Sequence, residues 1–168
     1  MSLSLSGALA APFTLKGNPV PSPALIAGTV TQAATIADTN ETDLAAWTIP
    51  GGLLGIDGRG LRLTAFGSFA ANANNKRVRA YFGSVTLADT AAIAANGVNW
   101  LVEVVMFRTG ASAQLFRNRM QHGTTLIALG LGTGAISNAA DQLLRVTGLN
   151  GTASANDIVL RGAHVELL

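Results

Sequence analysis

The sequence predicts an all-β protein: a single-domain antiparallel β-sandwich of jelly-roll type with an extended N-terminal arm. Through residues 29–168, short segments that alternate apolar and polar residues are separated by turn signals at intervals of roughly 8–14 residues, as in sandwiches and barrels. The 168 residues are enough for one hydrophobic core and short for two. We therefore expect about eight strands in one domain, with no long helix.

Residues 1–28 form the predicted arm and hold four of the five prolines, at positions 12, 19, 21 and 23. Each proline fixes φ and removes a hydrogen-bond donor, so this segment is neither a helix nor a central strand. Its apolar content is nevertheless too high for a solvated linker. The arm either docks on a partner or wraps around its own domain; the residues proposed to anchor it to a capsid are Phe13, Leu15, Val20 and Ile26.

The predicted strands of residues 29–168 follow from alternation, because successive side chains of a strand point to opposite faces. Three segments, 60–70, 76–88 and 98–110, show the pattern most clearly. Val78, Ala80 and Phe82 are expected to point into the sandwich. In the other two segments the alternation puts on one face Leu61, Leu63 and Ala65, and Trp100, Val102, Val104 and Met106.

Two connections between strands carry specific predictions. The alanine-rich segment 88–97 favours a short helix, with Asp89 as its cap. Asn150-Gly151 is the dipeptide typical of a tight hairpin, so we expect residues 142–150 and the last strand to pair through it.

The composition limits the classes of function. Apolar residues make up 49% of the chain and charged residues only 12%, against roughly 25% charged in a typical soluble protein. A chain with so little charge is expected to bury surface against copies of itself or a larger assembly. The net charge of +2 argues against a direct nucleic-acid partner. No apolar run reaches the ~18 residues of a membrane span, and no basic region precedes the N-terminal apolar residues.

No set of residues in the sequence indicates catalysis, a cofactor or a metal. Cysteine is absent, which excludes disulfides and thiol chemistry. His164 and Glu166 share a face of the last strand, but a zinc site needs three or four ligands. The glycines of residues 130–135 match a dinucleotide fingerprint only superficially, because no βαβ unit surrounds them. We therefore expect a protein that is not an enzyme.

The positive charges of the segment NANNKRVRAYFG, residues 72–83, are the one local cluster of cations. On a strand, Arg77, Arg79 and Tyr81 share one face, and Lys76 lies on the other with Val78. The exposed face suits phosphates or bases, or else a surface or subunit interface. Because the net charge is small, we favour the surface or interface interpretation, with NANN as a loop tip.

The series of strands resembles small jelly-roll proteins of tailed-phage virions. The similarity lies in a strand ending in IP and glycines, a long strand followed by an asparagine-containing loop, a Trp- and Glu-containing strand ending in TG, and a closing strand. It covers about residues 29–168; the segments are TNETDLAAWTIPGGLL, GLRLTAFGSFAANANNKRVRAYFG, NWLVEVVMFRTG and NDIVLRGAHVELL.

The resemblance implies a homotrimeric component of the virion, assembled in the cytoplasm of the bacterial host. Its expected partners are other copies of itself and the major capsid protein or another virion protein. The leading interpretation is a capsid decoration (cement) protein that binds the head lattice and stabilises it. The alternative is a receptor- or glycan-binding knob of a head fibre or tail appendage, with loops 56–60, 72–75 and 130–134 as its contact surface.

Overall fold

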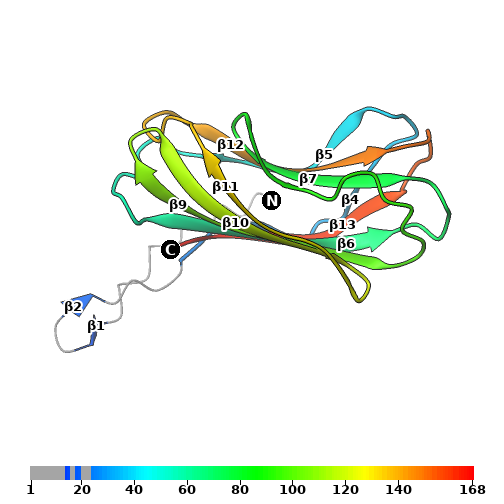
Figure 1. Cartoon of the computed structure of the whole chain (residues 1–168), viewed down its shortest axis with the longest axis horizontal. Coiled ribbons are helices and arrows are strands. Elements are labelled where there is room, and N and C mark those ends of the chain that lie inside the picture. The colour runs from blue at the N-terminus through cyan, green and yellow to red at the C-terminus, as the bar shows by residue number, and fades with distance from the viewer. Residues whose placement is uncertain (1–13, 16–17, 20–23) are drawn as a thin grey trace, which may run out of the picture.

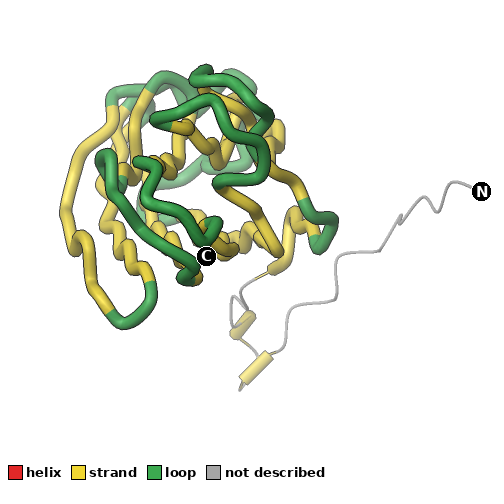
Figure 2. Tube along the Cα trace, turned by 90° about the vertical axis from the view of Figure 1, so that its right-hand side faces the viewer, coloured by secondary structure: helices red, strands yellow, loops and turns green. Residues whose placement is uncertain are grey.

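The computed structural model describes residues 14–15, 18–19 and 24–168, and this part of the chain contains strands, turns and loops but no helix (Figure 2). The strands are β1 (Thr14–Leu15), β2 (Asn18–Pro19), β3 (Ala24–Thr29), β4 (Ala33–Ala34), β5 (Glu41–Ile49), β6 (Gly60–Phe69), β7 (Lys76–Phe82), β8 (Val85–Asp89), β9 (Asn99–Gly110), β10 (Ala113–His122), β11 (Thr125–Gly134), β12 (Gln142–Asn150) and β13 (Ile158–Leu167). The predicted all-β class is confirmed. No helix of membrane-spanning length and apolarity occurs in the described ranges.

Two antiparallel sheets face each other and form the sandwich (Figure 1). The large sheet has the order β11-β10-β9-β6-β13-β3, with β4 also paired to β13, and the small sheet has the order β5-β12-β7-β8. The pairs β3–β13, β5–β12, β6–β9 and β7–β8 are nested in sequence, each inside the previous one. This is the pairing of one long hairpin rolled into two sheets, which defines a jelly roll. The hairpin β10–β11 is inserted between β9 and β12 and extends the large sheet.

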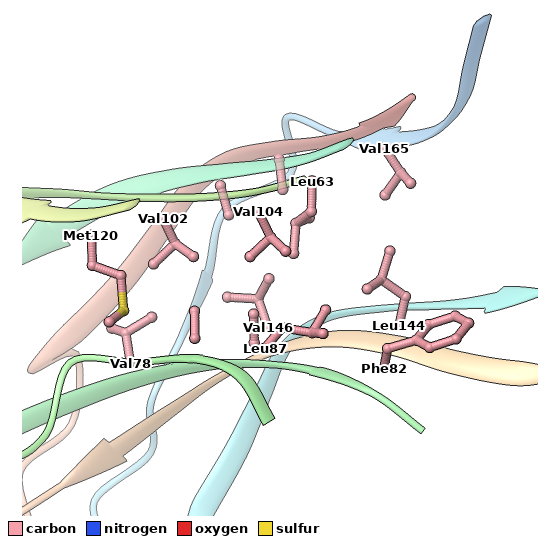
Figure 3. Packing of buried hydrophobic residues seen from close by; sticks show 14 of the residues in the cluster. Leu63, Val78, Phe82, Leu87, Val102, Val104, Met120, Leu144, Val146 and Val165 are labelled. Atoms are coloured by element: carbon pink, nitrogen blue, oxygen red, sulfur yellow. The ribbon is translucent and has the colours of Figure 1, made fainter. Parts of the chain in front are cut away.

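The core lies between the inner faces of the two sheets (Figure 3). Alternation within β6, β7 and β9 places every side chain predicted to point inward at 3% exposure or less. In Figure 3, the large-sheet residues Leu63, Val102 and Val165 face the small-sheet residues Val78 and Val146. The period-two pattern of the sequence therefore identified the core correctly.

The large sheet includes part of the segment that we assigned to the arm. Residues 24–29 form β3, which pairs with β13, and Ile26 packs against the core of its own domain. Leu15 lies in β1, which pairs with β2. Phe13 and Val20 lie outside the described residues. Capsid anchoring by these four residues stays a prediction.

The helix predicted for residues 88–97 is wrong. Ala88 and Asp89 are the last residues of β8 and pair with Ala80 and Arg79 of β7. The Asp89 carboxylate accepts a hydrogen bond from the backbone N–H of Ala91 at 2.8 Å. This contact resembles the predicted helix cap, but it lies in a turn. Ala91 has a φ of 56°, which ends any regular structure there. Pairing with β7 thus overrides the helix propensity of alanine.

The hairpin predicted at Asn150-Gly151 is also wrong, because β12 and β13 belong to different sheets. Gly151 is required for close packing instead: its N–H donates to Asn75 O at 2.7 Å, and an added Cβ would lie 2.8 Å from Asn75 Cβ. Residues 151–157 cross from the small sheet to the large sheet, as jelly-roll topology demands at this point of the chain.

Candidate functional site

Arg77, Arg79 and Tyr81 project from the outer face of the small sheet, as the alternation predicted. Their neighbours in β7, Val78, Ala80 and Phe82, are buried. Across the sheet, Arg79 lies opposite Thr147 of β12 and Asp89 of β8, and Tyr81 lies opposite Arg145 of β12. The residues therefore sit at the centre of a polar face built from four strands.

Glu41, at the start of β5, collects three hydrogen bonds on one carboxylate oxygen. Its Oε1 accepts Arg79 Nη1 at 3.1 Å, the Tyr81 hydroxyl at 2.9 Å and the Thr147 hydroxyl at 2.6 Å. Partial burial favours the protonated form, but the hydrogen bonds from Thr147, Tyr81 and Arg79 outweigh it and hold the pKa of Glu41 below its ordinary value. The carboxylate is thus charged at neutral pH, and its Oε1 accepts three hydrogen bonds.

Asp89, at the end of β8, is the second carboxylate of this face. It accepts Arg77 Nε at 2.7 Å, Arg79 Nε at 3.3 Å and the Ala91 N–H. Burial opposes its ionisation, and the hydrogen bonds from Arg77 and Ala91 with the nearby guanidinium charges overcome this, so its pKa is lowered. The same contacts raise the pKa of Arg77.

Arg145 of β12 completes the face. Its guanidinium carbon lies 4.6 Å from the centroid of the Tyr81 ring, a cation–π contact, and its Nη1 lies 3.2 Å from Asp43 Oδ1. The ion pairs thus match three guanidinium groups, Arg77, Arg79 and Arg145, with three carboxylates, Glu41, Asp43 and Asp89. A phosphate-binding site needs cations that are not already paired with carboxylates of the same chain. This neutral arrangement therefore favours a solvent-exposed surface or a protein contact over a nucleic-acid contact. The subunit-contact role itself stays a prediction.

The buried pair of charges at one end of the sandwich is a feature that the strand pattern did not reveal. Lys76 and Asp157 are both 0% exposed. Lys76 Nζ donates to four oxygens: Asn72 Oδ1 at 2.8 Å, Asn74 O at 2.9 Å, Ala95 O at 3.0 Å and Asn72 O at 3.1 Å. The only signal in the sequence is a lysine at an inward-pointing strand position directly after an asparagine-rich loop.

Asp157 neutralises Lys76 through the two asparagines that lie between them. Its carboxylate accepts the side-chain amides of Asn72 at 2.7 Å and Asn74 at 2.8 Å. Desolvation lowers the pKa of Lys76 despite the attraction of Asp157. The pKa of Asp157 is lowered because the bonds from Asn72 and Asn74 outweigh its desolvation. This cluster joins the loops that precede β7, β9 and β13, so Asn72 and Asn74 connect these loops, while Ala73 and Asn75 are exposed; the role of this loop in contacts stays a prediction.

Two hollows flank Phe66 on the outer face of the large sheet. One has a volume of about 410 Å³ and is lined by residues that include Asn99, Leu101, Gln121 and Arg161. The other, also about 410 Å³, is more apolar and is lined by residues that include Leu25, Val30, Gly162 and His164. An added Cβ at Gly162 would lie 2.8 Å from the Phe66 ring, so this glycine leaves the space that the ring occupies.

The glycines of residues 130–134 lie within β11 and not in a loop, so this part of the proposed contact surface is a strand. His164 and Glu166 do share the outer face of β13, but Glu166 forms an ion pair with Arg62 at 3.2 Å. In the described ranges, no three His, Asp or Glu side chains gather as metal ligands would.

Comparison with known proteins adds one structural match. No family model and no curated protein sequence matches the chain. The chain is similar in structure to the CBM2 module of the evolved Dit protein of Lactobacillus casei BL23 phage J-1. The similarity covers 72% of this chain and 67% of the chain of the CBM2 module, with 13% sequence identity and a TM-score of 0.38. The class of this protein, a jelly-roll β-sandwich, therefore rests on its own strand pairing.

Proposed function

We propose that the protein is a structural component of a tailed-phage virion, a capsid decoration protein that binds the head lattice as a homotrimer and stabilises it. The observation that carries this proposal is the number of large apolar side chains exposed on the outer face of the large sheet, in a chain with only 12% charged residues. Exposed apolar side chains gathered on one face, here with the ion pairs Arg62–Glu166 and Arg119–Glu103 among them, favour a protein contact site. The exposed side chains of this sheet are Leu25, Phe66, Phe107, Leu115, Leu126, Leu129 and Leu131.

A trimer on a lattice stabilises it by multivalency. Once one protomer has bound, the contacts of the other two become intramolecular, and the total affinity exceeds that of one contact by orders of magnitude. A rigid jelly roll suits this task, because little conformational entropy is lost when a preorganised surface binds. The sequence resemblance described above supports the virion as its location.

The test is binding to purified capsids that lack the protein. We expect co-sedimentation at saturating stoichiometry and a raised temperature of capsid disruption. Because β3 begins at Ala24, a deletion of residues 2–23 removes the arm up to β3, with β1 and β2, but no strand of the sandwich, and we expect lower occupancy from this variant. A compact monomer that leaves capsids unchanged contradicts the proposal.

A second candidate, the receptor- or glycan-binding knob, is favoured by the hollow between Phe66 and Arg161. An exposed aromatic ring beside amide and guanidinium groups is the chemistry that sugar rings and their hydroxyls need. Binding of the isolated protein to host cells, lost in Phe66→Ala and retained in Phe107→Ala, supports this candidate. Binding to capsids without binding to cells supports decoration.

A further inference from the structure

Strand β11 is an unprotected sheet edge. It pairs with β10 on one side, and no described residue pairs with it on the other. Natural proteins protect long edges with lysines, prolines, bulges or short strands, because an open edge is a template for another strand. β11 is ten residues long and contains no proline, and residues 123–140 contain no charged residue. Its pairing with β10 shifts register between Leu126 and Ala128, so the regular part of this open edge is residues 128–134.

The outer side of β11 is apolar. Leu129 and Leu131 are 66% and 83% exposed, while the alternating glycines at 130, 132 and 134 point to the inner side. An added Cβ at Gly132 would lie 2.4 Å from the Phe116 ring, so this glycine leaves the space that the ring occupies on the inner side. The strand thus presents leucines on one face and a bare main chain at its edge.

β11 is also held in place at both ends. The turn 123–124 ties it to β10, and the chain beyond its last residue is fixed by Gln114 of β10. Gln114 Nε2 donates to Ile136 O at 2.6 Å, and Ile136 N donates to Gln114 Oε1 at 3.1 Å. Asn118 in the middle of β10 donates to Leu87 O of β8 at 2.7 Å, which holds the hairpin against the small sheet. The edge is therefore preorganised, which lowers the entropic cost of pairing.

We propose that β11 is a two-fold contact with a second copy of this chain, in which the two β11 strands pair antiparallel across an axis at Gly130. In this register Leu129 of one copy lies opposite Leu131 of the other, and Leu131 opposite Leu129. It is the register that brings Leu129 and Leu131 of both copies together on one face. The main-chain groups of both edges are then hydrogen-bonded.

The charges near β11 favour a second copy as the occupant. Arg117 and Arg119 of β10 lie opposite Leu131 and Leu129. In the paired state, the β10 strands of the two copies are three strand spacings apart, about 14 Å. Screening over about 8 Å at physiological salt makes their repulsion small. Because β11 has no charged side chain, it forms no ion pair with a charged partner. Its uncharged, leucine-containing surface is complementary to the same surface on a second copy, as an isologous contact requires.

A two-fold contact uses one patch twice, whereas the subunits of a ring trimer meet through two different patches. The β11 contact therefore lies outside the proposed trimer and goes beyond the proposed function. On a trimeric protein it links two trimers; on a monomeric one it makes a dimer. Its removal halves the native mass when it closes two monomers into a dimer or two trimers into one hexamer.

The test is the native mass of the full chain and of Leu129→Lys/Leu131→Lys, measured by light scattering across micromolar concentrations. We expect the variant to have half the mass of the native protein, with an unchanged circular dichroism spectrum that shows an intact fold. The matched control is Leu25→Lys, which alters an equally exposed leucine at the opposite edge of the large sheet and is expected to keep the full mass. A native monomer or plain trimer, or a variant of unchanged mass, overturns the proposal.

Cross-linking tests the register, and the absence of native cysteine makes it clean. In Leu129→Cys/Leu131→Cys, opposite Cα atoms lie about 5.5 Å apart or less, within reach of a disulfide. We expect oxidation to give a covalent dimer. In the single variant Leu129→Cys, the two cysteines of a dimer lie diagonally across the strand pair, with their Cα atoms more than about 7 Å apart. This variant is expected to cross-link poorly. A disulfide between Leu25→Cys and Leu131→Cys chains, without one in the double variant, overturns the two-fold register in favour of a head-to-tail ring.

Discussion

Lys76 is the side chain whose burial most constrains one end of the sandwich. Its ammonium group has three protons and four oxygen acceptors, and its counter-charge, Asp157, is reached only through Asn72 and Asn74. Such a cluster is stable only when every member is satisfied, because an unpaired buried charge is costly. The sequence NANNK is thus a structural unit in which Asn72 and Asn74 supply three of the four oxygens that accept hydrogen bonds from Lys76.

Replacing Lys76 with methionine is therefore expected to destabilise the fold strongly. The change leaves the Asp157 charge buried and four oxygens without a donor, and we expect a loss of about 3 kcal/mol in the free energy of unfolding. Urea denaturation measures it. Arg62→Met, which removes an exposed ion pair with Glu166, serves as the control and is expected to cost less than about 1 kcal/mol. Equal losses in both variants would contradict this account.

The acid stability of the protein is expected to depend on the carboxylates with lowered pKa values, Glu41, Asp89 and Asp157. A carboxyl whose pKa is lower in the folded state than in the unfolded state stabilises the fold at pH values above its unfolded pKa. That contribution is lost as the pH falls through the folded pKa. We expect constant stability near neutrality and a decline below about pH 4.5, the ordinary pKa of glutamate.

Thermal melts between pH 7 and pH 2 measure this dependence. Glu41→Gln keeps an acceptor oxygen for Thr147 and Tyr81 but no longer titrates, so its curve is expected to be shallower below pH 4.5. Parallel curves for the two proteins would show that Glu41 does not contribute to the acid transition.

At the scale of the element, close contacts between strands decide which positions tolerate a side chain. Gly67 in β6 lies under the Trp100 indole of β9: an added Cβ would be 2.6 Å from Trp100 Cζ2 and 1.9 Å from Val159 O. The β6–β13 register shifts between Leu160 and Gly162, next to this contact. The glycine and the bulge together let two bulky strands approach.

Gly67→Ala is therefore expected to cost about 2–3 kcal/mol of unfolding free energy through overpacking. Gly110→Ala is the matched control, because an added Cβ there meets only Ala113 Cβ at 3.5 Å; we expect a change within about 0.5 kcal/mol. Chemical denaturation measures the unfolding free energies of both variants. Equal values for the two would refute the close contact at Gly67.

At the scale of the whole molecule, the two sheets have different outer faces. The small sheet carries a neutral network of ion pairs, and the large sheet carries exposed leucines and phenylalanines around a few charges. Solvent suits the first face, and protein contact suits the second. The molecule is thus asymmetric, and the contacts proposed above lie on the large sheet and at its β11 edge.

This distribution of charge predicts weak binding to nucleic acid. With a net charge of +2 and the β7 arginines paired internally, we expect no binding to a 30-base-pair duplex at about 150 mM salt in fluorescence anisotropy. Binding with a steep dependence on salt concentration would contradict the pairing of Arg77 and Arg79. Lysozyme, a strongly basic protein, is a suitable positive control.

The alternation of β6, β7 and β9 was readable from the sequence because it depends on a local rule, the period of two. The same rule placed Arg77, Arg79 and Tyr81 outside and Val78, Ala80 and Phe82 inside. The helix at 88–97 and the hairpin at Asn150-Gly151 were predicted wrongly because local propensity was overruled by strand partners distant in sequence. Asn72 and Asn74 are sequence neighbours of Lys76, but its other partners, Ala95 and Asp157, and all the partners of Glu41 come from strands and loops that no spacing rule connects.

The sequence by itself determined the all-β class, the inward-facing residues and the low charge from which we predict an assembled protein. These properties depend on composition and on side-chain alternation along one strand. Only the tertiary structure decided the nested strand order, the burial of Lys76 with Asp157, the neutralisation of the β7 arginines and the position of β11 at an open edge. Each of these depends on which distant strands become neighbours, and that choice is made by packing of the whole chain.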